Sequence, residues 1–571
     1  MSTAGRPKTG RAPRAPLAAD YVIVGAGSAG AAVAARLSED PRTTVLLLEA
    51  GPPDAALELH VPAAFSTLFR GRYDWNYDTV PQPQLENRTV YWPRGRTLGG
   101  SSSLNAMMWI RGFAADYDGW AEVAGEGWSW AALAPLFVRA EATQDAADLT
   151  QGRAGAQPVE HQRDPRPHTA AFLRAARELR HPVTPANLPD RQGFSQTMVT
   201  QHRGSRASTA DSYLRPARGR RNLRVVTDAL VRRVTFDDPA DGDAPPRATG
   251  VYVDIAGITR HARAHREVIL CGGAINTPQL LQLSGIGDAD ELRAHGIRAR
   301  VDAPGVGANL QDHLVAGLAP AARGGTLYGA KRPGQLMRYL SSRRGMLSSN
   351  VAEAYGFLRT PVAERAGAAP GLPDIEIIFA AAPYVGEGLV PPPAEGITVG
   401  AILLQPRSRG TIRLASADPT DAAVIDPGYL SDPDGIDAET LRAGLLECER
   451  LIATSALRAV TTGGWVQPVG GERMSAAERI ELSLRRYSHT LYHPVGTARM
   501  GEDRASVVDP QLRVRGVVGL RVADASVMPT IIRGQTSAPA IVIGERAADL
   551  IRGVGDDARP VPRRAGRWPV G

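Results

Sequence analysis

The N-terminal part of the chain alternates between apolar runs and stretches of small residues. An apolar run at 21–24 leads into the glycine-rich segment 25–30, and an alanine-rich stretch continues to about residue 37. A second apolar run occupies 45–48 and ends at Glu49. Short apolar runs rich in β-branched residues are typical of buried strands, and the small-residue stretch between them is typical of a helix. The pattern therefore predicts a strand, a glycine turn, a helix and a second strand, which form a βαβ unit.

Farther along the chain, the same patterns predict two kinds of sheet. Residues 140–170 are polar, contain several glycines and prolines, and are expected to form loops. We expect strands at 223–227, 229–236, 249–254, 266–271, 374–379, 397–404 and 411–414, the last of which follows a turn at 408–410. Helical patterns occupy 437–458, 475–488 and 537–552. The short turn between the middle strands favours an antiparallel sheet there.

These elements predict an α/β protein with two domains. One is a Rossmann-type nucleotide-binding domain that is discontinuous in sequence and comprises 20–110, 200–315 and 490–552. The other is an α+β domain, built on an antiparallel sheet with helices, that comprises 111–199 and 316–489 and covers the ligand. We expect the remaining segments, 1–19 and 553–571, to be disordered basic tails.

Composition and charge narrow the possible functions. Hydrophobic residues make up 43% and charged residues 22% of the 571 residues, which is typical of a globular protein. The net charge is +7, but residues 1–19 and 558–571 each carry +4 without an acid, which leaves −1 for the rest of the chain. We therefore expect no nucleic-acid partner. The chain has 2 cysteines, no apolar run of roughly 18 residues and no apolar leader, so we expect no membrane span and a cytoplasmic location.

The glycine-rich turn carries the first candidate chemistry. Gly25 permits a tight turn, Gly27 lets the backbone approach a pyrophosphate, and Gly30 lets the helix pack against the strand. The helix that begins near Ser28 offers free N–H groups and the positive end of its dipole to phosphates. Glu49 lies 19 residues after Gly30, where a carboxylate accepts hydrogen bonds from both ribose hydroxyls. An acid at this position favours FAD or NAD and disfavours NADP, whose 2′-phosphate it would repel.

Four further segments narrow the choice of cofactor. Residues 95–105 read Gly95-Arg96-Thr97-Leu98-Gly99-Gly100-Ser101-Ser102-Ser103-Leu104-Asn105, and residues 273–287 begin Gly273-Ala274-Ile275-Asn276-Thr277-Pro278. Together with the N-terminal turn, these segments resemble the signatures of the glucose–methanol–choline (GMC) oxidoreductase family of FAD enzymes. The blocks 492–501 and 522–526 are similar to the same family. The resemblance covers about residues 20–552 and implies an FAD-dependent enzyme that oxidises an alcohol.

The resemblance also implies which residues contact the cofactor. It places Asn105, Ala106 and Met107 against the isoalloxazine ring of FAD. It places Val231 against the adenine and Asp524 beside the ribityl and pyrophosphate groups. The other cofactor residues that it implies lie in the glycine- and serine-rich loop and in the C-terminal part, namely Arg96, Gly99, Gly100, Ser103, Ala525 and Gln535.

The attachment of the flavin is expected to be non-covalent. In some members of the family, a histidine just before the asparagine of the loop bonds covalently to the flavin. Leu104 stands at this position, and its side chain cannot form such a bond. We expect no metal in the site.

The candidate base is His493, in the Tyr-His-Pro-x-Gly-Thr context of residues 492–497. A neutral imidazole with a pKa of about 6.5 can take the hydroxyl proton of an alcohol. The resemblance implies that the α-hydrogen then leaves as hydride to flavin N5. The second active-site residue of the family, usually His or Asn, falls at Ser537, whose hydroxyl can bind a substrate oxygen but cannot share proton transfer as a histidine does. We expect His489 to be structural or a pocket wall, and Cys271 to be a buried strand residue.

Two other reactions on the same fold are alternatives. Light-driven fatty acid decarboxylases are similar in the segment 534–539, but they hold the substrate carboxylate with an arginine where this chain has Gln405, and they lack the base histidine. Hydroxynitrile lyases bind FAD without using its redox chemistry. The presence of His493 and the absence of that arginine favour alcohol oxidation.

The substrate and the electron acceptor are less well defined by the sequence. Candidate pocket walls are aromatic and favour a fairly apolar alcohol, namely Trp109, Tyr355, Phe379, Tyr384 and Tyr492. No acidic residue is evident that would pair with an ammonium group, so choline is a less favoured substrate. We expect the acceptor to be oxygen or a quinone-type carrier.

Overall fold

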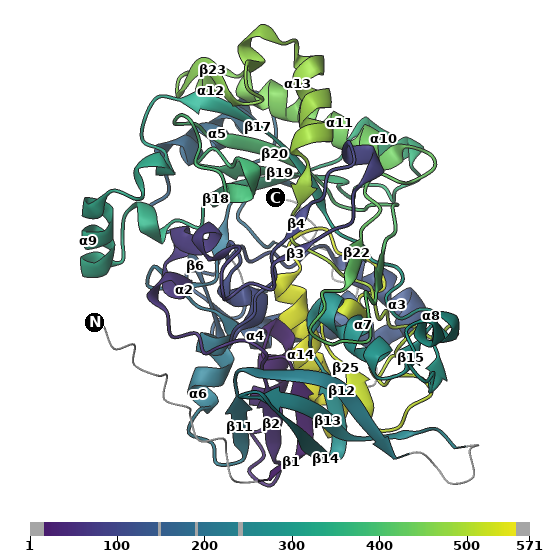
Figure 1. The fold of residues 1–571 in the computed structure, drawn as a ribbon. Coiled ribbons are helices and arrows are strands. Elements are labelled where there is room, and N and C mark those ends of the chain that lie inside the picture. Colours follow the sequence, from purple (N-terminus) through teal and green to yellow (C-terminus); the bar gives the residue numbers. More distant parts are fainter. Residues whose placement is uncertain (1–15, 147–149, 189–191, 238–243, 555–571) are drawn as a thin grey trace, which may run out of the picture.

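The two largest sheets of the described residues, each of seven strands, lie at opposite ends of the molecule (Figure 1). The computed structural model describes residues 16–146, 150–188, 192–237 and 244–554. The first strand begins at Leu17, so residues 17–19 belong to the fold and not to the tail expected for 1–19. The basic segments 1–15 and 555–571, for which disordered tails are expected, lie outside the described residues. Within the described residues, no helix combines the length and the apolar character needed to cross a bilayer.

The first sheet contains the βαβ unit that the sequence predicts. Strand β1 (Leu17–Val24), helix α1 (Ser28–Leu37) and strand β2 (Val45–Leu48) follow one another, and β2 is buried along its whole length. The other strands are β11 (Leu223–Val226), β12 (Ala229–Asp237), β13 (Arg247–Ile255), β14 (Ile258–Leu270) and β25 (Leu520–Val522). Their order is β11-β2-β1-β14-β13-β12, with β25 beside the end of β14. The four neighbouring strands β11, β2, β1 and β14 are parallel, as in a Rossmann-type sheet. Strands β13 and β12 extend the sheet beyond β14 as an antiparallel meander.

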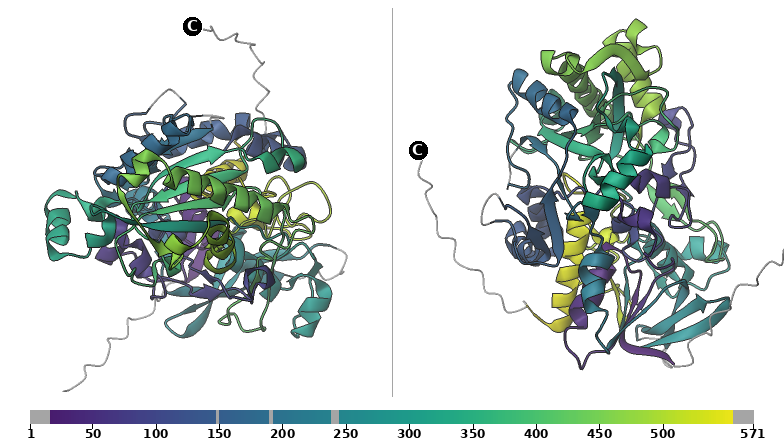
Figure 2. Two further views of the ribbon diagram at one scale, coloured as in Figure 1. Left: turned by 90° about the horizontal axis from the view of Figure 1, so that it is seen from above. Right: turned by 90° about the vertical axis from the view of Figure 1, so that its left-hand side faces the viewer.

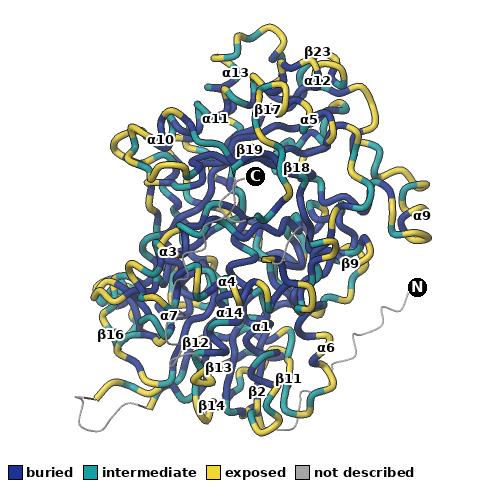
Figure 3. Tube along the Cα trace, turned by 180° about the vertical axis from the view of Figure 1, so that it is seen from behind, coloured by how far each residue is buried: buried dark blue, intermediate teal, exposed yellow. Residues whose placement is uncertain are grey.

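The second sheet is antiparallel, as the middle part of the sequence predicts. Its strands are β7 (Gly193–Gln196), β17 (Leu314–Ala322), β18 (Ala352–Leu358), β19 (Ile375–Ala380), β20 (Thr398–Leu403), β23 (Thr461–Gln467) and β24 (His489–Thr490). The order is β23-β17-β20-β19-β18-β7, with β24 beside β17. Helix α11 (Ile436–Ile452) buries its apolar side in the same hydrophobic cluster as these strands. The buried residues of both sheets form the dark interior of Figure 3.

The C-terminal helix α14 (Ser537–Arg552) connects the two regions. It packs beside α1 on the first sheet, and its N-terminal end points toward the second sheet (Figure 2). Helices α3 (Ala114–Ala124) and α4 (Trp130–Ala140) belong to the same hydrophobic cluster, and Arg139 of α4 pairs with Glu545 of α14 at 2.8 Å. These two helices therefore pack with α14 and the first sheet, whereas the boundaries expected from the sequence assign 111–199 to the second domain.

Three expectations about local structure need correction. The stretch 140–170 is not all loop, because it contains β5 (Glu141–Thr143), β6 (Gln157–His161) and the start of α5 (Pro167–Glu178). Pro167 occupies the first turn of α5, where a missing N–H costs nothing. The helix expected at 437–458 ends at Ile452, and Thr454 then caps a separate α12 (Ser455–Arg458). Among the described residues, strand β21 (Thr411–Arg413) pairs with β22 (Val424–Asp426) in a separate two-stranded sheet and does not join the second sheet.

Candidate active site

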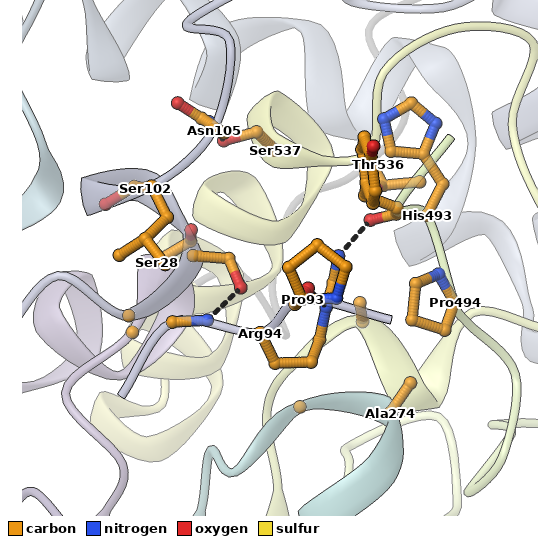
Figure 4. A pocket seen from close by; sticks show the side chains of 18 of the residues that line it. Ser28, Pro93, Arg94, Ser102, Asn105, Ala274, His493, Pro494, Thr536 and Ser537 are labelled. Carbon is orange, nitrogen blue, oxygen red and sulfur yellow. Dashed lines mark hydrogen bonds between the residues drawn. The ribbon is translucent and has the colours of Figure 1, made fainter. Parts of the chain in front are cut away.

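A cavity of about 340 Å³ is bounded by residues from both sheets. Its walls include the ends of β1 and β2, the start of α1, the loop before α3, and the segments around residues 493 and 535. The structure brings together 14 of the 18 site residues predicted from the sequence, namely Gly25, Gly27, Ser28, Glu49, Gly100, Asn105, Ala106, Met107, Val231, His493, Asp524, Ala525, Gln535 and Ser537. Figure 4 shows Asn105 next to Ser537 and His493 beside Thr536 in this cavity.

The glycine turn gives the nucleotide end of the cavity its shape. Gly25 has φ +98°, and a Cβ there would lie 2.4 Å from the carbonyl oxygen of Cys271. A Cβ on Gly30 would lie 2.0 Å from the carbonyl oxygen of Gly25. By contrast, a Cβ on Gly27 would meet only Cα of Gly100, at 3.9 Å. Gly25 and Gly30 therefore let the strand and helix pack closely, and Gly27 leaves the backbone open to a ligand.

Helix α1 points its N-terminus at this end of the cavity. Ser28 and Ala29 line the wall, and no side chain caps the first turn. The N–H groups of the first turn are thus free to bind an anion, and the helix dipole favours negative charge.

Glu49 lies at the end of β2, where the sequence predicts a ribose-binding acid. Its Oε2 accepts the N–H of Ala26 at 2.9 Å, and its Oε1 accepts the N–H of Gly51 at 2.9 Å. Burial raises the pKa of this carboxyl to about 7, although both N–H groups oppose the shift. The two bonds fix the carboxyl group, and each oxygen keeps a lone pair for a ligand hydroxyl.

Asp524 is the second carboxylate of the cavity wall. Its Oδ2 accepts the N–H of Gly273 at 2.8 Å and the hydroxyl of Thr277 at 2.6 Å, and its Oδ1 accepts the N–H of Ser526 at 2.8 Å. These bonds join the start of α7 (Gly273–Leu283) to the segment after β25. Asp524 therefore holds together two parts of the wall that are about 250 residues apart in sequence.

Asn105 ties the serine-rich loop to the start of α14. Its Oδ1 accepts the N–H of Met107 at 3.0 Å and a guanidinium N–H of Arg206 at 2.8 Å. Its Nδ2 lies 3.5 Å from Oγ of Ser537. Met107 has φ +56°, a strained backbone angle that these bonds help to hold.

Four predicted cofactor residues do not line the cavity. Gly30 packs between helix and strand, as described. Gly99 donates its N–H to the carbonyl of Ala26 at 2.8 Å, and Ser103 donates its hydroxyl to the carbonyl of Leu98 at 2.7 Å. The guanidinium of Arg96 lies 5.0 Å from the ring centroid of Trp75. These residues shape the loop from behind.

The donors and open backbone at this end fit FAD. The uncapped start of α1 and the open Gly27 suit a pyrophosphate, and the fixed Glu49 suits a ribose. At the other end of the cavity, near His493, the buried Oε1 of Gln535 has no hydrogen-bond partner among the described residues. Leu104, at the position where a histidine would be needed for a covalent bond, is buried in a small apolar cluster with Leu59 and Leu68. Within the described residues, no group of three or more His, Cys, Asp or Glu side chains is arranged to hold a metal.

Gln535 is held by a buried acid. Its Nε2 donates to Oε1 of Glu376, on β19, at 3.0 Å, and Oε2 of Glu376 has no partner among the described residues. Burial raises the pKa of Glu376 to about 8, because this amide is the one compensating contact that the described residues provide. Glu376 is therefore a neutral acid at pH 7.

His493 forms a chain of imidazoles with a residue that the sequence did not single out. Nδ1 of His493 lies 2.9 Å from Nδ1 of His313, and Nε2 of His313 lies 3.0 Å from the carbonyl oxygen of Leu404. Since a carbonyl only accepts, Nε2 of His313 carries its hydrogen there, and Nδ1 of His313 is an acceptor. Nδ1 of His493 then donates, which leaves the lone pair on Nε2 of His493.

The surroundings keep both rings neutral. Burial lowers the pKa of His313 to about 4. Burial also lowers the pKa of His493 well below 6.5, with smaller contributions from His313 and Arg94. The backbone of His493 is fixed as well, because its N–H donates to Oδ1 of Asp312 at 2.8 Å. Asp312 in turn accepts the hydroxyl of Tyr429.

Arg94 brings a buried positive charge to the same wall. Its Nη2 donates to the carbonyl of Tyr492 at 2.6 Å, and its Nε donates to the carbonyl of Pro93 at 2.5 Å. No carboxylate within the described residues forms an ion pair with it, and burial lowers its pKa.

Aromatic side chains close the end of the cavity near His493. Tyr384 and Tyr492 line it as predicted, with their hydroxyl oxygens 2.8 Å apart. The other predicted walls are wrong, because Trp109, Tyr355 and Phe379 do not line the cavity and are buried in the two hydrophobic clusters. Phe379, for example, stacks on Phe172 at 4.7 Å between centroids. Large aromatic side chains are usually buried, whether they line a cavity or pack in the core. The local sequence does not distinguish these two environments, so the three residues could not be told apart from wall residues.

The comparisons with known proteins agree with this geometry. Two sequence models of GMC oxidoreductases match residues 19–315 and 406–544. The chain belongs to the GMC oxidoreductase family. An uncharacterized GMC-type oxidoreductase of Mycobacterium bovis is 53% identical over 537 residues, which cover 93% of this chain and 99% of that relative. Mitochondrial choline dehydrogenase of Mus musculus is 40% identical over 551 residues, or 93% of this chain and 89% of that enzyme.

Solved structures show the same fold. The crystal structure of pyridoxine 4-oxidase from Mesorbium loti aligns with a TM-score of 0.83 at 32% identity, over 94% of this chain and 99% of that chain. This GMC oxidoreductase therefore has the expected architecture of an FAD domain with a mixed, largely parallel sheet and a substrate domain with an antiparallel sheet. FAD is the cofactor expected of the family.

Several residues of this GMC oxidoreductase site were missed from the sequence. Phe65 and Phe69 line the aromatic end. They lie in and directly after the short 3₁₀ helix η1 (Pro62–Leu68), whose sequence has no periodic apolar pattern. The sequence-based prediction of site residues also missed Arg94 and His313. A signal existed for His313, because the polar pair Asp312-His313 directly precedes the apolar run of β17.

The two remaining predictions about cavity residues concern His489 and Cys271. His489 lines the cavity, its Nδ1 lies 2.8 Å from the carbonyl oxygen of Thr490, and burial lowers its pKa to about 4. Cys271 is buried at the end of β14, and burial raises the pKa of its thiol well above the usual value. This burial and the raised pKa favour the interpretation of Cys271 as a structural residue and not as a nucleophile.

Proposed function

We propose that this GMC oxidoreductase oxidises an uncharged alcohol to an aldehyde or ketone, with His493 as the base and FAD bound non-covalently. The observation that carries the proposal is the hydrogen-bond chain from Leu404 through His313 to His493. It leaves a lone pair on one ring nitrogen of His493 in a cavity that has the features of an FAD site.

The proposed cofactor contacts follow the wall of the cavity. The start of α1 would bind the pyrophosphate, Glu49 the ribose, Val231 the adenine, and residues 105–107 the isoalloxazine. Asp524 and Ala525 would lie at the ribityl and pyrophosphate groups. When bound, FAD supplies the hydride acceptor. Leu104 supports non-covalent attachment, since its side chain has no nucleophilic atom.

His493 has the properties of a general base. Its neutral Nε2 accepts the hydroxyl proton of the alcohol. The imidazolium that results keeps its Nδ1–H bond to His313, whose own orientation is fixed by the carbonyl of Leu404. The hydroxyl of Ser537 and the amide of Gln535 are the other polar groups near this end, and we propose that they orient the substrate oxygen.

Two observations support an uncharged substrate. The carboxylates among the described lining residues are Glu49 and Asp524, and both accept bonds from the protein at the nucleotide end. Near His493, the charged side chain of the described cavity wall is Arg94, which is positive, whereas Asp312 accepts the N–H of His493 and does not line the cavity. A cationic alcohol such as choline would therefore lose its hydration without gaining an ion pair. In this respect, we expect the chain to differ from its relative choline dehydrogenase.

The alternative reactions have less support. Gln405, at the position of the carboxylate-binding arginine of the decarboxylases, donates its Nε2 to the carbonyl of Ile531 at 2.7 Å and does not line the cavity. Reduction of the flavin by an alcohol distinguishes an oxidoreductase from a hydroxynitrile lyase, which binds FAD without using its redox chemistry. We propose oxygen or a quinone-type carrier as the electron acceptor.

The test is anaerobic addition of a panel of alcohols to the FAD-loaded enzyme, with flavin absorbance as the readout. We expect uncharged primary alcohols to bleach the flavin, and choline to react with a kcat/KM at least roughly tenfold lower. Bleaching by choline as efficient as by uncharged alcohols would contradict the substrate class. Bleaching by no alcohol, with hydrocarbon release from a fatty acid under light, would contradict the reaction.

A further inference from the structure

Helix α9 (Pro333–Ser342) carries an unusual group of exposed apolar side chains. Leu336 is 44% exposed, Met337 67% and Leu340 46%, and Tyr339 alone on this helix is buried. The three exposed residues are spaced i, i+1 and i+4, so they share one face of the helix. Figure 3 shows α9 at the edge of the molecule, coloured as exposed over most of its length. We call these three residues the α9 apolar face.

Positive charge surrounds the α9 apolar face. Between residues 328 and 345 the chain has five basic residues and no acid, namely Lys331, Arg332, Arg338, Arg343 and Arg344. Asp164 pairs with Arg338 at 3.5 Å and with Arg344 at 3.0 Å. For the other three cations, the described residues provide no ion pair. An apolar face flanked by excess Lys and Arg is the pattern of a helix that lies in a membrane interface.

The apolar surface continues toward the aromatic end of the cavity. Tyr339 donates its hydroxyl to the carbonyl of His60 at 3.2 Å, at the end of α2 (Leu57–His60), whose Leu57 is also exposed. The next element, η1, carries Phe65 of the cavity wall. Gly388 also packs against Ser66 of η1, and the next two residues, Leu389 and Val390, are exposed. Exposed apolar residues thus lie close to η1, the element that contributes Phe65 to the cavity wall.

We propose that the α9 apolar face docks this enzyme on the surface of an anionic lipid bilayer. The apolar side chains enter the boundary between headgroups and acyl chains, and the surrounding cations meet the lipid charge. A second copy of the chain fits less well, because a two-fold interface would place the same basic cluster on both sides. Three apolar side chains also cover far less area than a stable dimer needs. This inference is independent of the reaction proposed above.

The experiment is flotation of the full-length, FAD-loaded enzyme with lipid vesicles. Vesicles of phosphatidylcholine alone are compared with vesicles that also contain phosphatidylglycerol. We expect binding to the anionic vesicles only, and a loss of affinity of roughly tenfold or more in L336S/M337S/L340S. V469S is the matched control, since Val469 is 74% exposed outside this surface, and it should bind as the wild type does.

Two further readouts separate lipid docking by the α9 apolar face from a folding defect and from dimerisation. The triple variant must keep its flavin spectrum and its thermal transition, and K331E/R332E, which reverses two cations without removing apolar surface, should also weaken binding. Full binding by the triple variant would overturn the proposal and assign the affinity to the basic segments at the chain ends. Equal binding to both vesicle types would overturn the role of charge. Loss of a wild-type oligomer in the triple variant without lipid would assign the face to a second copy.

Discussion

The nucleotide end and the substrate end of the cavity are built from different parts of the chain. At the nucleotide end, one stretch of about 30 residues supplies the glycine turn, the helix start and Glu49. At the substrate end, the walls come from segments near residues 65, 313, 384, 493 and 535. The first is mainly a backbone structure, whereas the second depends on side chains that only the tertiary fold brings together. The difference predicts that damage at one end leaves the other end intact.

Removal of the base should give the largest loss of activity and leave the cofactor in place. In H493Q the ring nitrogen that accepts the proton is absent, so we expect kcat/KM to fall by roughly 100- to 10,000-fold. Bound flavin per protein should equal that of the wild type, because His493 belongs to the substrate end. Loss of flavin from H493Q would break the separation of the two ends.

The opposite pattern is expected for Gly30→Ala. The new Cβ would lie 2.0 Å from the carbonyl oxygen of Gly25, so strand and helix must move apart, at a cost of about 1–3 kcal/mol in unfolding free energy. We expect bound flavin per protein and Tm to fall together. Gly119→Ala is the matched control, because its Cβ has no atom within 4 Å, and it should leave both values unchanged or raise Tm. Equal flavin content in the two variants would contradict this account of the turn.

A smaller loss is expected from His313, which acts through His493. In H313A the acceptor for Nδ1–H of His493 is missing, and we expect kcat to fall roughly tenfold to 100-fold, less than for the base itself. In H313Q the amide oxygen can accept the same bond and should restore part of the rate. The pH profile is the second readout, since loss of the partner should shift the apparent pKa for activity in H313A. A merely structural role would give no shift and no rescue.

An effect on stability alone is expected from the Gln535–Glu376 pair. Burial raises the pKa of Glu376 to about 8 from 4.5, so the folded protein holds a proton that the unfolded chain releases as pH rises through this window. This contribution to stability therefore declines between pH 4.5 and 8. E376Q mimics the neutral acid and does not titrate. Between pH 5 and pH 8, its free energy of unfolding should therefore rise by about 1–3 kcal/mol relative to that of the wild type.

Glu353 provides the contrast for that measurement. It is also buried, but Ser349, Thr169 and the N–H of Arg166 donate to its carboxylate. E353Q should destabilise the protein at pH 5 and at pH 8, because the NH₂ group of the new glutamine would lie against groups that donate hydrogen bonds and do not accept its own. Parallel Tm changes in E376Q and E353Q across this pH range would contradict the assignment of Glu376 as a neutral acid.

The same contrast explains what could be predicted from the sequence. Gly25, Gly27, Gly30 and Glu49 act within one βαβ unit, so their spacing alone predicts their role. His493 was found through its sequence context, but its partner His313 lies 180 residues away and follows from the topology of β17 and β24. A periodic pattern reports burial and does not report which cavity a side chain faces. For this reason, Tyr384 and Trp109 looked alike in the sequence and differ in the structure.

The pH dependence of anaerobic flavin reduction by an alcohol tests the central claim, that His493 is a neutral base held by His313. Because the pKa of His493 lies well below 6.5, its base form persists as pH falls, and we expect the reduction rate to stay constant from pH 8 to below pH 6. The same rates in H493Q should be low and independent of pH in this range. A wild-type rate that falls through pH 6.5, or an H493Q enzyme that reduces its flavin at the wild-type rate, would contradict the account.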